Sequence, residues 1–295
     1  MTPSQESSSV TRPEEMESAL TTSTLPLPAF VPLTDARAEL GESPVWSPAH
    51  VSYSWVDIIG RRLFRTAPDG ETQDWATPEI PGFVQCVAGA VFVGMESGIF
   101  SFDPGTGSFH LRCELRQSGV RFNDACTDPQ GRIWAGTMDL ENRRHCGVLY
   151  RFDTVTGALV TVAEGFLTVN GLAWDAARNR LYLSDSHPSV QTVWTCALQD
   201  DGTLGPRTLF ADFHPHEGRP DGAALDAEGT YWIAGVGGAR LYRFAADGAL
   251  MAEIEVPVAS PTKPAFGPGG EMVVTSFADD GHGGRLLISR RPQDT

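Results

Sequence analysis

Short runs of alternating hydrophobic and polar residues occupy most of the chain, and turns containing glycine separate them. One kind of run recurs: an apolar–aromatic–x–aromatic stretch that ends in a glycine turn. Alternation with a period of two predicts β-strands, and a tight turn between two such strands predicts a β-hairpin. These predicted hairpins lie at 61–71, 98–109, 147–159, 193–204 and 239–251, and a shorter run at 284–291 follows them.

A second predicted hairpin precedes each of the first kind. Its polar turn is DPQG at 128–131, DAARN at 175–179, DAEG at 226–229 and GPGG at 267–270. Two hairpins make four strands, and a repeat of about 40–50 residues with four strands is typical of a propeller blade. The six repeats therefore predict an all-β fold, a six-bladed β-propeller, over residues 29–295. A two-sheet sandwich is the alternative, but it does not account for six similar units.

Residues 1–28 lack this pattern. They are rich in Ser and Thr, contain Glu6, Glu14, Glu15 and Glu17, and have no aromatic residue. Such a segment cannot bury enough surface to offset its ordering entropy, so we expect a disordered acidic tail. It also lacks the basic region and apolar run of a secretory signal peptide.

Polar residues recur at one position of the repeat, where the first strand opens, about 11 residues before a core residue of the second strand. The first strand of each blade lines the channel of a propeller, so equivalent positions converge on one axis. Thr262 takes this position in the sixth repeat, and the second repeat is apolar near Phe83 and Val84. The four carboxylate or amide residues at this position are Glu42, Asn123, Asn170 and Asp221.

Two carboxylates that face each other across a narrow channel repel unless a cation lies between them. Oxygen ligands with a charge of −2 suit Ca²⁺, Mg²⁺ or Mn²⁺, and they are compatible with Zn²⁺ or Fe²⁺. The simpler interpretation is that these residues cap strands, because Asn170 and Asp221 each precede a glycine and are ordinary turn formers. Four polar residues at one repeat position, Glu42 among them, favour a binding site.

Charge and cysteine content narrow the choice of partners. The net charge is −15, from 22 basic and 37 acidic residues, and no basic patch offers itself to nucleic acid. No apolar run approaches the roughly 20 residues of a membrane span. The five cysteines are scattered singly without a CxxC pair, which indicates reduced thiols and a cytoplasmic protein. We expect no nucleic-acid or membrane partner, and a monomer or weak homo-oligomer.

Six motifs together resemble the gluconolactonase/senescence marker protein 30 (regucalcin) family. They span about residues 38–290, and the chain departs from the family at Ser43 and Ala125, where members often have glycine. The resemblance implies a six-bladed propeller with one metal ion in its channel. The motifs are GESPVW (41–46), RFNDACTDPQGRIWAGTMD (121–139), NGLAWD (170–175), LYLSDS (181–186), RPDGAALDAEGTYWIA (219–234) and PTKPAFG (261–267).

The resemblance also implies an activity and roles for single residues. Family members hydrolyse sugar lactones to aldonic acids, with the metal as Lewis acid. Their motifs make Glu42, Asn170 and Asp221 the ligands of one divalent ion (Ca²⁺, Zn²⁺, Mn²⁺, Mg²⁺ or Fe²⁺), and Asp221 also the general base. Arg121 and Asn123 correspond to residues that contact substrate hydroxyls, and Glu141 is assigned to the substrate from its place after the GTM segment.

Other functions remain open at this stage. One is a non-catalytic calcium-binding regulatory propeller, and another is a paraoxonase-like lactonase or organophosphatase, against which the polar pair Arg121 and Asn123 argues. No GxSxG elbow is present, which disfavours a serine esterase. His214 and His216 could be metal ligands, but Pro215 between them favours a surface turn. Three aspartates that follow the channel positions are expected to anchor turns: Asp124, Asp128 and Asp226.

Overall fold

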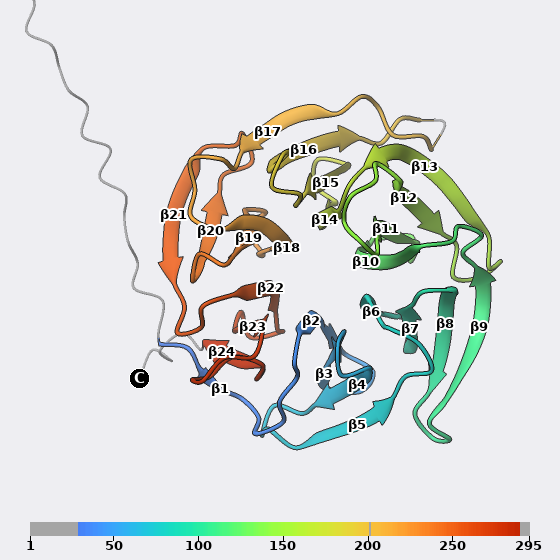
Figure 1. Cartoon of the computed structure of the whole chain (residues 1–295), viewed down its shortest axis with the longest axis vertical. Helices are drawn as coiled ribbons and strands as arrows, with labels where there is room; N and C mark the ends of the chain where they lie inside the picture. The colour runs from blue at the N-terminus through green and yellow to red at the C-terminus, as the bar shows by residue number, and fades with distance from the viewer. Residues whose placement is uncertain (1–28, 201, 290–295) are drawn as a thin grey trace, which may run out of the picture.

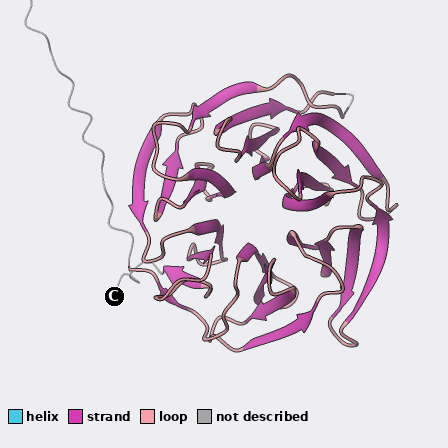
Figure 2. Cartoon of the chain, in the orientation of Figure 1, coloured by secondary structure: helices cyan, strands magenta, loops and turns pink. Residues whose placement is uncertain are grey.

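The computed structural model describes residues 29–200 and 202–289 of the 295-residue chain. These residues form six four-stranded antiparallel sheets, arranged around a central channel as the blades of a propeller (Figure 1). They contain strands and loops but no helix (Figure 2). The predicted six-bladed propeller is confirmed, whereas the tail predicted at 1–28 lies outside the described residues.

Each blade runs from an innermost strand at the channel to an outermost strand at the rim. Blade 1 is β2 (Gly41–Ser47), β3 (Ser52–Asp57), β4 (Arg62–Thr66) and β5 (Thr72–Ala76). Blade 2 is β6 (Phe83–Val87), β7 (Ala90–Gly94), β8 (Gly98–Asp103) and β9 (Ser108–Glu114). Blade 3 is β10 (Val120–Thr127), β11 (Ile133–Asp139), β12 (Gly147–Phe152) and β13 (Leu159–Phe166).

The remaining blades follow the same order, except at the last strand. Blade 4 is β14 (Val169–Asp175), β15 (Arg180–Asp185), β16 (Thr192–Ala197) and β17 (Thr208–Asp212). Blade 5 is β18 (Arg219–Leu225), β19 (Tyr231–Val236), β20 (Arg240–Phe244) and β21 (Leu250–Glu255). Blade 6 is β22 (Pro261–Phe266), β23 (Met272–Ser276), β24 (Leu287–Ser289) and β1 (Val31–Pro32).

The first strand of the chain closes the last blade. Val31 pairs with Ile288 and Pro32 with Leu287, so β1 becomes the outer strand of blade 6. The short run at 284–291 therefore finds its partner at the other end of the chain. This pairing joins the first and last parts of the ring, which leaves no gap between blade 6 and blade 1.

Apolar side chains of neighbouring blades pack face to face and form the core. Tyr182 of blade 4 stacks on Tyr231 of blade 5 with ring centroids 4.6 Å apart, and Phe92 of blade 2 meets Phe152 of blade 3 edge-on at 5.8 Å. All six residues of β19 are buried. Because the middle strands are covered on both faces, they read as nearly continuous apolar runs, and their burial holds the blades together.

Aspartates anchor the inner hairpin turns, as predicted for Asp128 and Asp226. Asp128 accepts hydrogen bonds from the backbone N–H of Gln130, at 3.0 Å, and from the indole N–H of Trp134, at 2.9 Å. Asp226 accepts the equivalent indole N–H of Trp232 at 2.8 Å. Each aspartate thus couples the turn to a large side chain of the next strand.

All five cysteines are free thiols. Among the described residues, no helix has the length and apolar character needed to span a membrane.

Candidate functional site

A β-bulge shapes the channel end of the innermost strand in five of the six blades. In each of these five, the pairing of the first two strands skips residues on the inner strand only. The exception is β6 of blade 2, which pairs in regular register with β7 and carries no carboxylate or amide at the predicted position. A bulge adds a residue and redirects side chains. The bulges lie between Glu42 and Val45, Phe122 and Ala125, Asn170 and Ala173, Pro220 and Ala223, and Pro261 and Lys263.

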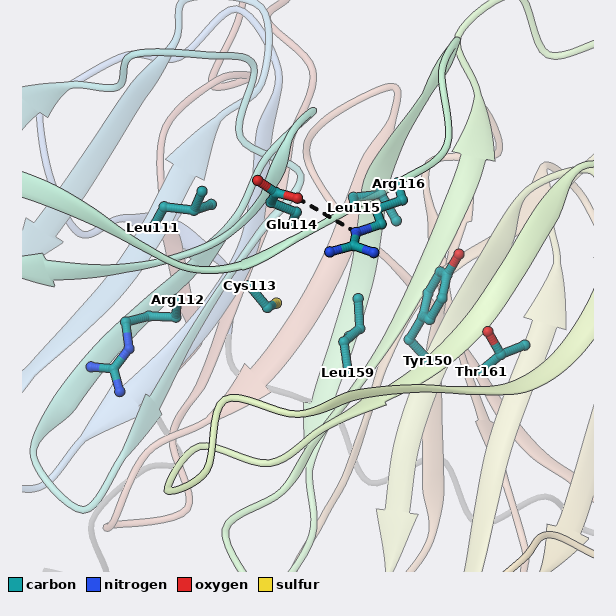
Figure 3. Close-up of a pocket in the computed structure, with 9 residues that line it drawn as sticks. All are labelled: Leu111, Arg112, Cys113, Glu114, Leu115, Arg116, Tyr150, Leu159 and Thr161. Carbon is teal, nitrogen blue, oxygen red and sulfur yellow. Dashed lines mark ion pairs between the residues drawn. The ribbon is translucent and has the colours of Figure 1, made fainter.

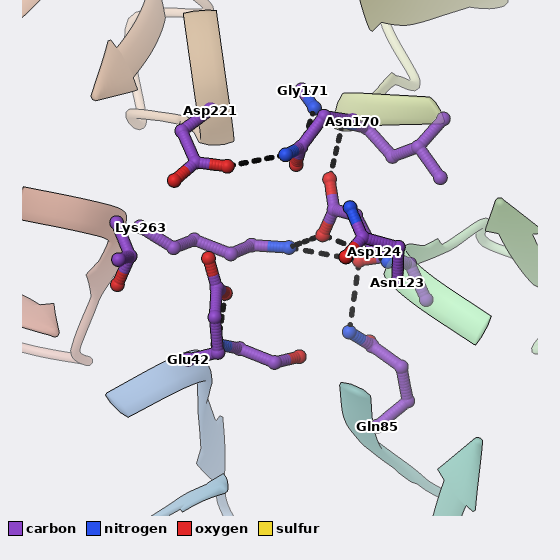
Figure 4. A network of polar contacts seen from close by, with 12 residues as sticks. Glu42, Gln85, Asn123, Asp124, Asn170, Gly171, Asp221 and Lys263 are labelled. Atoms are coloured by element: carbon purple, nitrogen blue, oxygen red, sulfur yellow. Dashed lines mark hydrogen bonds and ion pairs between the residues drawn. The ribbon is translucent and has the colours of Figure 1, made fainter. Parts of the chain in front are cut away.

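Glu42, Asn170 and Asp221 converge in the channel from blades 1, 4 and 5 (Figure 4). All three are buried. The Asn170 side-chain nitrogen donates a hydrogen bond to Oδ1 of Asp221, and its oxygen accepts one from the Gly171 N–H at 3.1 Å. Glu42 Oε2 accepts the N–H of Ser43 at 2.5 Å. The structure therefore brings together the three residues predicted as metal ligands.

The residues that follow two of these positions have left-handed backbone. Ser43 has a φ of 54° and Gly171 has a φ of 61°. In this conformation the backbone N–H of each residue donates a hydrogen bond to the preceding side chain, that of Glu42 or Asn170. Tyr231 donates its hydroxyl to the Gly171 carbonyl at 2.8 Å, which ties the turn beside Asn170 to blade 5.

Burial and mutual repulsion keep protons on the two carboxylates. Burial, followed by the charge of Asp124, raises the pKa of Asp221 from 3.8 to about 7. Burial and the charge of Asp221 raise the pKa of Glu42 well above its usual value. A cation between them would reverse both effects, because it favours the charged form of each.

The donor set fits a hard divalent cation. No group of three or more His, Cys, Asp or Glu within the described residues could hold a metal, so any ligand set here must include the amide. Two carboxylates and one amide oxygen match the preferences of such an ion in chemistry and in charge. The amide oxygen of Asn170 can take the place of its nitrogen by a half-turn about the last side-chain bond, since both occupy similar volumes.

Arg121 and Asn123 lie beside this cluster, on β10. The Arg121 guanidinium donates hydrogen bonds of 2.8 Å to the Asn123 side-chain oxygen and to the Phe122 carbonyl. Asn123 in turn donates to the carbonyl of Val169, at 3.1 Å, directly before Asn170. Burial lowers the pKa of Arg121 to about 10, so it remains cationic at neutral pH. The two predicted substrate residues are thus brought together at the ligand cluster.

Glu141 lies apart from this cluster. It stands in the turn after β11, with its side chain 74% exposed, and pairs with Arg143 at 3.7 Å. Its contact with a substrate stays a prediction.

The sequence analysis missed two charged residues of the channel. Asp124 was expected to anchor a turn, and that expectation is wrong: it lies within β10 and is buried in the channel (Figure 4). In a regular strand, consecutive side chains point to opposite faces, but the bulge after Phe122 places Asn123 and Asp124 together. Lys263, its partner, comes from β22; a lysine in the largely apolar PTKPAFG strand was the available signal.

Two cavities lie outside the polar cluster. One, of about 440 Å³, occupies the opposite end of the channel and is lined by the inner strands, including Trp46, Trp174 and Lys263. The other, of about 650 Å³, is an outer groove between blades 2 and 3, bordered by Leu111, Tyr150 and other residues (Figure 3). The outer groove contains none of the predicted site residues.

The two histidines of the HPHEG segment serve the surface and the core. His214 is exposed, and its Nδ1 lies 2.7 Å from Oδ1 of Asp212. His216 packs against Tyr242, with ring centroids 4.8 Å apart. They point to different neighbours, so the structure does not join them into a ligand pair.

Comparison with known proteins adds relatives of defined names. Residues 40–278 match the model of the SMP-30/gluconolactonase/LRE-like region. The chain is 38% identical over 244 residues to a 6-deoxy-6-sulfogluconolactonase of Pseudomonas putida, covering 81% of this chain and 82% of the relative. It is 31% identical over 261 residues to a pentonolactonase of Haloferax volcanii, covering 85% and 86%.

Solved structures agree with the fold. A regucalcin from Agrobacterium tumefaciens, described as a calcium-binding protein, superposes with a TM-score of 0.81 at 26% identity. The match covers 89% of this chain and 93% of that protein.

Proposed function

The chain belongs to the SMP-30/gluconolactonase/LRE-like family, and from this premise we propose that it is a metal-dependent hydrolase of sugar lactones, which it opens to free aldonic acids. The observation that carries the proposal is the buried convergence of Glu42, Asn170 and Asp221 in the channel. Relatives named as a sulfogluconolactonase and a pentonolactonase support the same reaction class.

Glu42, Asn170 and Asp221 would hold the ion. A divalent cation bound there supplies a Lewis acid for the lactone carbonyl. The carboxylates of Glu42 and Asp221 provide the negative charge that retains the ion, and Asn170 completes the set as a neutral donor. Burial of all three keeps competing water from their oxygens.

Asp221 is the proposed general base. Its Oδ1 is engaged by Asn170, which leaves Oδ2 to accept a proton from the attacking water. The water oxygen bonds to the carbonyl carbon as this proton moves to Asp221. The ring carbon–oxygen bond then breaks, and the proton passes from Asp221 to the departing ring oxygen, which becomes the free hydroxyl of the aldonic acid.

Arg121 and Asn123 would orient the sugar. Arg121 presents a planar fork of donors, and Asn123 can both donate and accept, which suits a polyhydroxylated ring. Their hydrogen bond to each other, 2.8 Å long, holds both side chains in place before a substrate arrives.

A second arginine favours lactones that carry a negative group. Arg219 stands two residues before Asp221, as Arg121 stands two before Asn123. Its side chain donates a long hydrogen bond, 3.4 Å, to the Ser186 carbonyl, and its charge lowers the pKa of Asp221. Two cations at neighbouring positions would attract an acidic substituent towards a protein of net charge −15. The sulfonated substrate named for the Pseudomonas putida relative is of this kind.

The test is turnover with defined metals. The purified full-length chain is stripped with a chelator, single divalent ions are added back, and acid release is followed from neutral and acidic aldono-γ- and δ-lactones. We expect ion-dependent turnover of at least one lactone. Metal binding without turnover of any lactone would instead support a calcium-binding regulator. Faster hydrolysis of phosphotriesters or aryl esters than of sugar lactones would support a paraoxonase-like enzyme.

A further inference from the structure

A buried ion pair lies across the channel next to the candidate metal ligands. Lys263 Nζ is 2.5 Å from Oδ1 of Asp124 and 3.0 Å from the Ala125 carbonyl oxygen. The two charged side chains are only 5% and 2% exposed. Figure 4 shows the Lys263 side chain extending from blade 6 towards Asp124, with Asp221 on one side and Glu42 on the other.

Asp124 is held by the backbone as well as by the lysine. Its Oδ1 accepts the N–H of Ala125 at 2.8 Å, and its Oδ2 accepts the N–H of Leu172 at 2.7 Å. These bonds connect blade 3 to blade 4, two residues beyond Asn170. The carboxylate is therefore a fixed acceptor, whereas the lysine reaches it through a flexible four-carbon stem.

The stem of Lys263 passes directly beside a candidate ligand. Gly222 follows Asp221, and a Cβ added there would lie 2.5–2.7 Å from Cβ, Cγ and Cδ of Lys263. Glycine at this position makes room for the lysine. The positive charge of Lys263 also lowers the pKa of both Glu42 and Asp221, so it acts on both carboxylates.

We propose that Asp124 is a positioning residue that holds the Lys263 ammonium away from Glu42 and Asp221, and so keeps these carboxylates available for a divalent cation. The inference rests on the metal site of the proposed function. A compact ammonium inside a low-dielectric channel is strongly attracted to any carboxylate within reach. Without Asp124, it would pair with Glu42 or Asp221, and an incoming metal would have to displace it.

The charge of the buried group is consistent with this division. Glu42, Asp124 and Asp221 contribute three negative charges when ionised, and Lys263 contributes one positive charge. Pairing Lys263 with Asp124 leaves a charge of −2 on the two ligand carboxylates, which one divalent cation balances. Pairing Lys263 with a ligand instead would leave the balancing charge on Asp124, which lies outside the proposed ligand set.

A double-mutant cycle on the full-length protein tests the inference. Mn²⁺ is titrated by calorimetry into wild type, Asp124→Asn, Lys263→Met and the double variant, all stripped of metal. We expect Asp124→Asn to weaken Mn²⁺ binding by about 10- to 100-fold, because the freed ammonium competes for the ligand carboxylates. The double variant should return to within about threefold of wild type, because it has no ammonium to release.

A purely structural role for Asp124 predicts another pattern. If its bonds to Ala125 and Leu172 were all that mattered, Asp124→Asn and the double variant would be weakened equally, and the inference would be overturned. Lys263→Met decides the matter alone if Asp124→Asn does not fold: we expect Mn²⁺ binding at least as tight as wild type. Binding weakened tenfold or more in Lys263→Met would mean that the ammonium supports the site.

These titrations use no substrate, so their outcome is separate from that of the lactone assay. Loss of the lactonase proposal through absent turnover leaves the predicted order of Mn²⁺ affinities standing. Wild-type protein that binds none of Mn²⁺, Ca²⁺ or Zn²⁺ overturns the inference whatever the lactone assay gives.

Discussion

The side chains of Asn170 and Asp221 meet through a hydrogen bond from the amide nitrogen to Oδ1, although 51 residues separate them in the chain. They come from the innermost strands of blades 4 and 5, whose contact is part of the ring. The bond leaves the second oxygen of Asp221 for chemistry and fixes the direction in which that oxygen points. The catalytic role proposed for Asp221 thus depends on a neighbouring blade.

Asp221→Asn should abolish lactone hydrolysis while preserving the fold. The variant keeps the shape of the side chain but removes the base, and losing a positioned base costs about 10²- to 10⁴-fold in rate. The measurement is kcat with saturating metal and lactone. Asp226→Asn is the matched control, because it changes a carboxylate of the same strand pair that anchors a turn; it should lower the melting temperature but leave kcat near wild type.

Metal-free protein should lose a stabilising contribution of Asp221 as the pH rises from about 4 to about 7. The pKa of this group is raised in the folded protein from 3.8 to about 7. Between these values the folded state holds the proton and the unfolded state does not, so the free energy of unfolding falls with rising pH. Urea unfolding of wild type and Asp221→Asn across pH 4–8 isolates this contribution. A constant difference between the two proteins would contradict it, and saturating metal should reduce the slope.

Asn123→Ala should mainly raise KM. The side chain is proposed to contact substrate hydroxyls without joining the reaction, so its removal affects substrate and transition state alike. We expect KM to rise by about tenfold, the effect of roughly one hydrogen bond, with kcat within about threefold. A matching fall in kcat at unchanged KM would instead place Asn123 in the chemical step.

Arg219→Gln should change substrate preference. We expect kcat/KM to fall by about tenfold or more for a sulfonated lactone, through loss of a charge-assisted contact, and to stay near wild type for its neutral counterpart. Arg207→Gln is the matched control, since Arg207 packs over Phe166 and Trp194 on the outer part of blade 4. Equal loss with both lactones would show that Arg219 does not select for charge.

Ser43→Gly should be more stable than Ser43→Ala by about 1 kcal/mol. Both variants lose the hydroxyl, which donates to the Val84 carbonyl at 3.2 Å and accepts its N–H at 3.1 Å. Only glycine is relieved of strain at a φ of 54°, where a left-handed conformation costs other residues about 1–2 kcal/mol. Chemical unfolding of the two variants provides the comparison. Equal stabilities would mean that the backbone at Ser43 relaxes after substitution.

Much of the architecture was readable from local patterns. Alternation and turn residues predicted the hairpins, and their repetition predicted the blades, because strand formation and tight turns depend on neighbouring residues. The same repeat position placed Glu42, Asn123, Asn170 and Asp221 on the channel, and the structure brings all four to its polar cluster. Asp128 and Asp226 were also read correctly as turn anchors.

Tertiary structure alone decided the rest. The closing pair of β1 and β24 joins opposite ends of the chain, which no local pattern encodes. Asp124 enters the channel because a bulge cancels the alternation that would have turned it away from Asn123. Its bond to Lys263 spans 139 positions of sequence, and whether that ammonium faces Asp124, Glu42 or Asp221 depends on distances across the ring. Sequence thus determined which polar groups reach the channel, whereas packing of the blades determined how their charges pair, because Coulomb energies depend on separation in space.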